Sequence, residues 1–98
     1  MLALDVRCRL IRAKTLGVGS LIACPVDPRI VFGWLLRTSA HVAVALHNHP
    51  SGDVTPSDGD RELTARLKQA GELIGIRLVD HVIIGRNSHF SFAAEGLL

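Results

Sequence analysis

The chain has 98 residues, 48% of them apolar, which is enough for one small domain with a modest core. Its formal net charge is only +2, its eleven Lys and Arg form no basic run, and it has only four aromatic residues. This composition argues against a dedicated nucleic-acid surface, which usually shows clustered cations and stacking rings. Asp5, Arg7 and Arg9 interrupt any export-type apolar region, and no stretch is long enough to cross a bilayer, so a membrane protein is also excluded.

The two cysteines, Cys8 and Cys24, are far apart and do not have metal-ligand spacing. Each is therefore expected to be a small buried residue, although a disulfide between them stays open. Two cysteines in a chain without a signal peptide favour a reducing compartment, and we expect a cytoplasmic protein.

The first third of the chain predicts β-strands. Apolar and polar residues alternate with a period of two along residues 2–10, which is typical of a strand with one buried face. The glycine-rich residues 17–20 predict a turn, and a short apolar segment follows at 21–25.

A helix is predicted to begin at Asp27 and Pro28, which suit its N-cap and first helical positions. Helical spacing then gives it a broad apolar face, so that Trp34 is interpreted as a core residue and not as a ligand platform. That face contains Ile30, Val31, Trp34 and Leu35.

The apolar residues 42–46 predict a strand in the middle of the sheet, buried on both faces. His41 precedes this strand and is interpreted as an exposed turn residue. His47 and His49 follow it, and residues two apart on a strand point to the same face with their Cα atoms about 7 Å apart. Both imidazoles can therefore converge on one ion, since zinc takes nitrogen ligands at about 2.0–2.1 Å.

Residues 57–74 predict a second helix, with Ser57 as its N-cap, Asp60 in its first turn and Gly75 just after its end. By itself, Asp60 would most often be a capping partner. Beside His47 and His49 it becomes a candidate third ligand, and three protein ligands with one open position are typical of a catalytic zinc. The apolar face of this helix is expected at Leu63, Leu67, Ala70 and Ile74.

The last part predicts another strand at residues 80–85, followed by a turn and a final segment at 86–92 whose two phenylalanines share one face. His81, together with Asp80, is interpreted as a structural residue or as a hydrogen-bonding support for a ligand, with direct coordination as the alternative. His89 is expected to be exposed.

The string from His47 to Asp60 resembles the JAMM (MPN-domain) metalloprotease motif, His-x-His-Pro followed by Ser-x-x-Asp, and its wording is similar to the bacterial RadC-like branch of that family. The similarity continues at residues 27–29, 63–64, 70–71, 80–81 and 91–98, and so covers nearly the whole chain. It implies a single JAMM/MPN-type domain over residues 1–98. The implied fold is α/β, of the α+β type: a mixed β-sheet flanked by helices, with the metal site beside one edge.

The resemblance also implies a chemistry, the hydrolysis of an amide or isopeptide bond in a peptide or protein by zinc-activated water. His47, His49 and Asp60 would hold Zn²⁺, and Ser57 would be a catalytic donor to the oxyanion. Residues 50–52 would shape the loop between the ligands.

The family's proton-accepting glutamate is expected on the first strand, a few residues before a stretch that resembles residues 2–5. That position falls before residue 1, so the 98-residue chain is expected to be a poor enzyme by itself. The only acids before His47 are Asp5, which resembles a different position of the family, and Asp27, which is committed to a helix start. Glu62, Glu72 and Glu95 come later, on elements that would not point at the water.

Two alternatives stay open: a non-catalytic scaffold of the MPN type, and a DNA-associated role suggested by the family's historical naming as DNA-repair proteins. Self-association and the identity of the metal also stay open, because imidazole and carboxylate suit several divalent ions.

Overall fold

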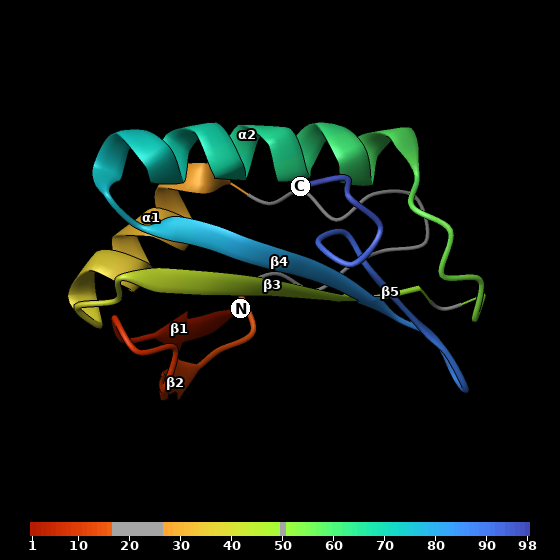
Figure 1. Cartoon of the computed structure of the whole chain (residues 1–98), viewed down its shortest axis with the longest axis horizontal. Coiled ribbons are helices and arrows are strands. Elements are labelled where there is room, and N and C mark those ends of the chain that lie inside the picture. Colours follow the sequence, from red (N-terminus) through yellow and green to blue (C-terminus); the bar gives the residue numbers. More distant parts are fainter. Residues whose placement is uncertain (17–26, 50) are drawn as a thin grey trace.

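The computed structural model describes residues 1–16, 27–49 and 51–98, and these form a five-stranded mixed sheet with two helices (Figure 1). The strand order is β2-β1-β3-β4-β5, in which only β3 and β4 are parallel neighbours. The strands are β1 (Leu2–Leu4), β2 (Leu10–Ala13), β3 (Val42–Asn48), β4 (Arg77–Ile84) and β5 (His89–Ser91). The predicted fold class is confirmed. None of the described helices is both long and apolar enough to span a membrane.

The first two strands form a hairpin, and this corrects the expectation for residues 2–10. The carboxylate of Asp5 accepts hydrogen bonds from the backbone N–H groups of Arg7 and Arg9, at 2.9 Å each, and so turns the chain between β1 and β2. Cys8 lies in this turn with φ 61° and is exposed, so the prediction that it is buried is wrong. Cys24 and the elements predicted at 17–20 and 21–25 lie outside the described residues.

Helix α1 (Pro28–Arg37) begins as predicted, because the side chain of Asp27 accepts a hydrogen bond from the N–H of Arg29 and Pro28 starts the helix. Trp34 is only 5% exposed and belongs to the core, which confirms its structural interpretation. Ile30 is 56% exposed, so the apolar face is narrower than the spacing predicted.

Helix α2 (Asp58–Ile74) begins at the predicted N-cap, Ser57, and ends at Gly75, which has φ 90°. Of the predicted apolar face, Leu67 is buried and Leu63 and Ala70 pack against the core, but Ile74 is 45% exposed. The fully buried residues of the helix are Asp60, Thr64, Leu67 and Gly71. Only glycine fits at position 71, because a Cβ atom there would lie 2.2 Å from the carbonyl oxygen of Ile76. The chain leaving α2 therefore passes directly over Gly71.

The core lies between the helices and one face of the sheet. It combines residues of both helices with Ala3 of β1, Ala43 and Ala45 of β3, and Leu78 of β4. Strand β3 is central, as predicted, and its first residues are buried, but Leu46 is 41% exposed. Burial on both faces therefore stops before the end of the strand.

A register shift separates the two halves of the β3–β4 pair. Ala43 lies opposite Leu78, but Ala45 lies opposite His81, so β4 carries one extra residue between these pairs. Leu78 and His81 are both buried on the helix-covered side. Strand β4 also begins at Arg77, three residues before the predicted start.

Candidate metal centre

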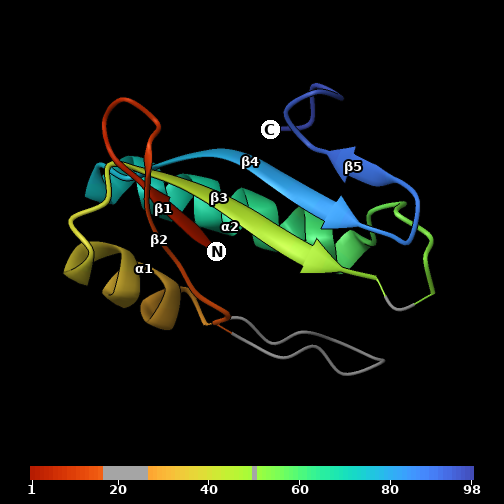
Figure 2. The same cartoon turned by 90° about the horizontal axis from the view of Figure 1, so that it is seen from below.

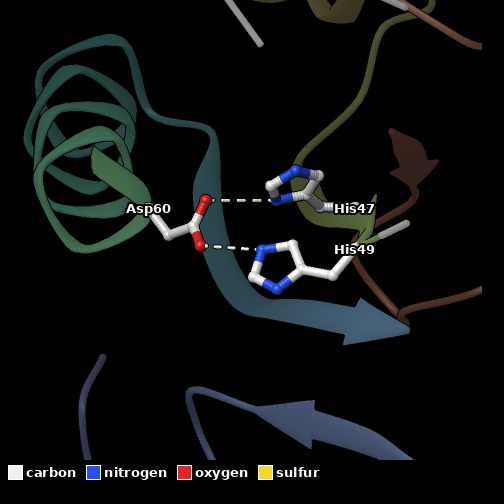
Figure 3. Close-up of side chains that lie close together, drawn as sticks. All are labelled: His47, His49 and Asp60. Atoms are coloured by element: carbon white, nitrogen blue, oxygen red, sulfur yellow. Dashed lines mark hydrogen bonds and ion pairs between the residues drawn. The ribbon is translucent and has the colours of Figure 1, made fainter. Parts of the chain in front are cut away.

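Two histidines at the carboxyl end of β3 face the first turn of α2 (Figure 3). Nδ1 of His47 lies 3.2 Å from Oδ1 of Asp60, and Nε2 of His49 lies 3.0 Å from Oδ2 of the same carboxylate. His49 lies just beyond the end of β3, but its N–H still donates a hydrogen bond to the carbonyl of Ile84 at 3.3 Å. The backbone pairing with β4 therefore positions His49 as well. The structure thus brings the three predicted ligands together at the end of the central strand. The predicted metal site beside one edge of the sheet therefore lies at the edge that the strand ends form, and not along an edge strand.

Asp60 has a capping role in addition to its contacts with the histidines. Its Oδ2 accepts a hydrogen bond from the N–H of Ser57 at 2.9 Å, while the Ser57 hydroxyl accepts one from the N–H of Asp60 at 3.1 Å. This reciprocal pair is a capping box, and it fixes the carboxylate at the helix N-terminus. The two roles considered for Asp60 are therefore compatible in one geometry.

The carboxylate of Asp60 is only 6% exposed, yet its pKa is lowered. Burial by itself would raise the pKa, but the hydrogen bonds from Ser57 and the charges of His47 and His49 outweigh burial. Asp60 is therefore ionised at neutral pH and offers a full negative charge to a cation.

The ring of His49 has a hydrogen-bond acceptor at each nitrogen. Its Nδ1 lies 2.7 Å from the carbonyl oxygen of Asp53, and its Nε2 faces the Asp60 carboxylate. A neutral imidazole carries only one N–H, and neither a carbonyl nor a carboxylate can donate. The site between His49 and Asp60 therefore needs a second ring proton or a metal ion. With Nδ1–H held by Asp53, the lone pair of Nε2 points at that site, as in histidines that bind metals.

The donor set fits a single ion. One nitrogen from each histidine and one Asp60 oxygen all lie within 4.8 Å of one another. Ligands of a tetrahedral zinc at 2.0–2.1 Å are roughly 3.4 Å apart, so small side-chain adjustments would be enough to bind an ion. His47, His49 and Asp60 could therefore hold a metal ion.

The loop between the ligands is held against the end of β4. A Cβ atom at Gly85 would lie 2.7 Å from the carbonyl oxygen of Gly52, so only glycine allows this approach. Gly52 itself has φ 82°, and its N–H donates to the carbonyl of His49 at 2.9 Å. These contacts position the Asp53 carbonyl that holds His49. Pro50, predicted to shape this loop, lies outside the described residues.

His81 lies behind the cluster and is only 2% exposed. The hydroxyl of Thr64 donates to the carbonyl of Asp60 at 2.7 Å, so its oxygen accepts from Nδ1–H of His81 at 2.6 Å. The ring stacks on Phe92 at 4.8 Å between centroids and lies 6.0 Å from the ring of His47. Burial, aided by the charge of His47, lowers the pKa of His81 to about 4. His81 is therefore neutral and supports the site from beneath, in agreement with its structural interpretation.

Comparison with known proteins identifies the family. The family model described as the RadC-like JAB domain matches residues 1–97. The chain belongs to this family. A UPF0758 protein of Thermotoga maritima is 48% identical over 98 residues, and one of Chlorobaculum tepidum is 45% identical over the same length. Each match covers the whole chain but only 44% of the relative, so the chain spans less than half the length of these relatives.

The other predicted residues of this RadC-like JAB domain fall into two groups. The Ser57 side chain is exposed beside the cluster, where it acts as the N-cap of α2. His41 and His89 are exposed, as predicted, and contribute nothing to the cluster. Within the described residues the cluster contains no glutamate.

The sequence analysis missed Thr64 and the Asp53 carbonyl. Thr64 gave a signal: it lies four residues after Asp60, one helical turn further along the same face, but it was not considered as a hydrogen-bonding residue. The contact of Asp53 is made by its backbone, so no side-chain pattern could have revealed it.

Proposed function

We propose that this RadC-like JAB domain is a zinc-dependent hydrolase that cleaves amide or isopeptide bonds in a peptide or protein substrate. The observation that supports this best is the arrangement around His49. Its ring lies between a carbonyl oxygen and a carboxylate, so one ring nitrogen needs either an additional proton or a metal ion. His47 turns its own ring nitrogen to the same carboxylate. Two nitrogens and one oxygen with a free fourth direction are typical of hydrolytic zinc sites.

Each ligand would be held by a contact of its own. The capping box fixes Asp60, the Asp53 carbonyl fixes His49, and the strand ladder fixes the backbone of His47. When bound, zinc would act as a Lewis acid and would lower the pKa of water towards neutrality. The chain's contribution is then to keep the ligands in place while the substrate changes.

Ser57 is proposed to stabilise the developing oxyanion. Its oxygen already accepts from the N–H of Asp60, which leaves the hydroxyl hydrogen free to point towards solvent. The hydroxyl lies next to the third ligand, so a substrate carbonyl at the metal would be near it. Loss of one such donor typically costs about 10²–10³ in turnover.

The proton acceptor is proposed to be the glutamate that the family resemblance puts before residue 1. The 98-residue segment alone is then expected to bind zinc and to turn over slowly, because positioned acid–base groups contribute about 10²–10⁴ in rate. A longer version that carries a glutamate a few residues before Leu2 should raise peptidase turnover at unchanged zinc content. Equal turnover with and without this segment would mean that another residue is the base.

Elemental analysis tests the metal directly. The wild type is expected to bind about one zinc per chain, and the double variant His47→Ala, His49→Ala is expected to bind almost none. The matched control is His41→Ala, His89→Ala, which removes two exposed histidines from outside the cluster. If all three proteins carry equally little zinc after dialysis against zinc-containing buffer, this is not a metal site.

The non-catalytic alternative makes a different prediction. A scaffold would keep its fold and its partners when the ligands are replaced, and it would show no turnover even with the upstream glutamate present. A DNA-associated role would instead require salt-dependent DNA binding, and an absence of binding at low salt would dismiss it.

A further inference from the structure

A second candidate site lies away from the metal ligands, where edge strand β2 faces helix α1 (Figure 2). A hollow of about 630 Å³ opens between them, a size within the range of ligand sites. Four consecutive residues of one wall belong to β2 and the residue after it, and the other wall is the last part of α1. Its lining residues are Ile11, Arg12, Ala13, Lys14, Trp34, Arg37 and Thr38.

The lining of this hollow, which we call the β2–α1 pocket, carries three cations and no acid. Within the described residues, no ion pair involves Arg12, Lys14 or Arg37. Arg37 lies in the last turn of α1, where a cation is favoured by the helix dipole. Arg12 and Lys14 have no such compensation.

The surrounding charges increase this imbalance. Six of the eleven Lys and Arg precede residue 42, but only two of the nine acids do. Both of those acids are already paired, Asp5 with Arg9 and Asp27 with Arg29, at 2.9 Å each. The charges of this first part of the chain therefore favour an anionic ligand, and neither of its two acids is free to supply the negative charge.

The shape of the pocket favours an extended polypeptide over a nucleic acid. Among the described strands, β2 has a partner on one side only, so its outer edge offers backbone hydrogen-bonding groups along the pocket wall. Single-stranded nucleic acids bind chiefly by stacking on exposed aromatic faces. The one aromatic residue of the pocket, Trp34, is only 5% exposed and offers no such face.

We propose that the β2–α1 pocket binds an extended acidic peptide segment, whose backbone pairs with β2 and whose carboxylates contact Arg12, Lys14 and Arg37. Carboxylates suit these cations, since arginine binds them through two parallel hydrogen bonds. The binding itself requires no metal.

The position of the pocket gives this binding a consequence for the substrate, which rests on the function proposed above. Ala13 lies opposite Leu2, which lies opposite Val44, three residues before His47. From strand spacings, the pocket is roughly 15 Å from His47, and an extended peptide covers this distance in about five residues. An acidic stretch bound at β2 would therefore leave the same chain within reach of the metal centre.

Binding is tested with N-acetylated hexaglutamate on the whole chain at low salt. Trp34 is the chain's single tryptophan and lines the pocket, so its fluorescence reports occupancy, and anisotropy of a labelled peptide gives an independent affinity. We expect saturable binding that weakens as salt is added. Hexaglutamine should not bind, and hexaglutamate with alternate backbone N-methyl groups should bind more weakly, because it cannot pair with the strand edge.

The decisive comparison uses two triple variants with the same change in charge. Arg12→Gln, Lys14→Gln, Arg37→Gln should weaken hexaglutamate binding by about 10-fold or more. The matched control Arg61→Gln, Arg66→Gln, Lys68→Gln on α2 should leave it within about twofold of the wild type. Unfolding curves show whether both variants are folded, and three single-residue variants replace the triple variant if it is not.

Three results would overturn the proposal: equal weakening by both triple variants, no hexaglutamate binding at low salt, or tighter binding of a thymidine oligonucleotide with six phosphates. The His47→Ala, His49→Ala variant separates this proposal from the metal centre. Hexaglutamate binding that persists in this variant supports the pocket whether or not the centre is hydrolytic.

Discussion

Two aspartates anchor opposite parts of this domain, and they use their carboxylates differently. Asp5 accepts three hydrogen bonds, all from Arg7 and Arg9 in its own exposed turn. Asp60 also accepts from a near neighbour, Ser57, but it is buried and faces two imidazoles that come from another element. The number of hydrogen bonds is therefore not what marks a site. A site is marked instead by burial of the carboxylate and by partners from a distant part of the chain, here imidazoles that still need a proton or a metal ion.

The largest expected effect is on zinc affinity, which should depend on Asp60 and not on Asp5. Asp60→Ala should lower zinc affinity by more than about 100-fold, because even partners that only orient a ligand typically contribute 10–100-fold. Asp5→Ala should leave zinc affinity unchanged and loosen only the hairpin turn. Competition with a zinc chelator measures both. Similar affinities in the two variants would remove the distinction drawn between them.

The second effect concerns His81, the buried and neutral histidine behind the metal ligands, and its contribution to the free energy of unfolding. The pKa of His81 is about 4 in the fold and about 6.5 in an unfolded chain, so its contribution to stability is complete above pH 6.5. That contribution should be lost as the pH falls towards 4, by at most about 3 kcal/mol. Urea unfolding of the metal-free protein from pH 7 to pH 4 measures it. His81→Gln should flatten this part of the profile, and an equally steep profile would assign the loss to other groups.

A smaller effect concerns the cap that Asp60 shares with Ser57. Ser57→Ala should cost about 0.5–2 kcal/mol of unfolding free energy, because the N–H of Asp60 loses its acceptor. Zinc content should stay near that of the wild type, since Ser57 is not among the three converging donors. An unchanged denaturant midpoint would show that this hydroxyl does not contribute to helix stability.

The smallest effect is expected in the turn that Asp5 holds. Cys8 has φ 61°, a left-handed conformation that glycine adopts without the usual penalty. Cys8→Gly should therefore raise the unfolding free energy by about 1 kcal/mol or less, after the entropy of glycine in the unfolded chain is included. Cys8→Ala is the control and should not stabilise. Zinc affinity should be the same in both.

The sequence predicted best what local rules control. The start of α1 at Asp27, the cap at Ser57 and the shared face of His47 and His49 all follow from spacings of one to three residues. These rules also brought Asp60 to the histidines, because the loop joins a strand end to a helix start. That the three residues bind zinc stays a prediction.

The sequence failed where the path of the backbone decides, even over a few residues. Ile74 was expected on the buried face of α2 but is exposed, and the chain that leaves the helix returns over Gly71 instead. The alternation along residues 2–10 could not show that Asp5 would bind the backbone of its own turn. Such contacts depend on the three-dimensional path of the chain, which a period of two or 3.6 does not contain.

The extra residue in β4 has a consequence for any attempt to edit or align this strand. Residues of a regular strand alternate between its two faces, so Leu78 and His81, three positions apart, could not both face the helices without the extra residue between them. Deletion of one residue between them would restore regular alternation and would keep His81 behind the metal ligands. A deletion in the regular part of β4 that follows would instead exchange the faces of the residues beyond it, and Ile83, now fully buried, would turn to the other side. A one-residue length difference between relatives in this strand therefore leaves the support of the metal ligands unchanged only where it removes the extra residue.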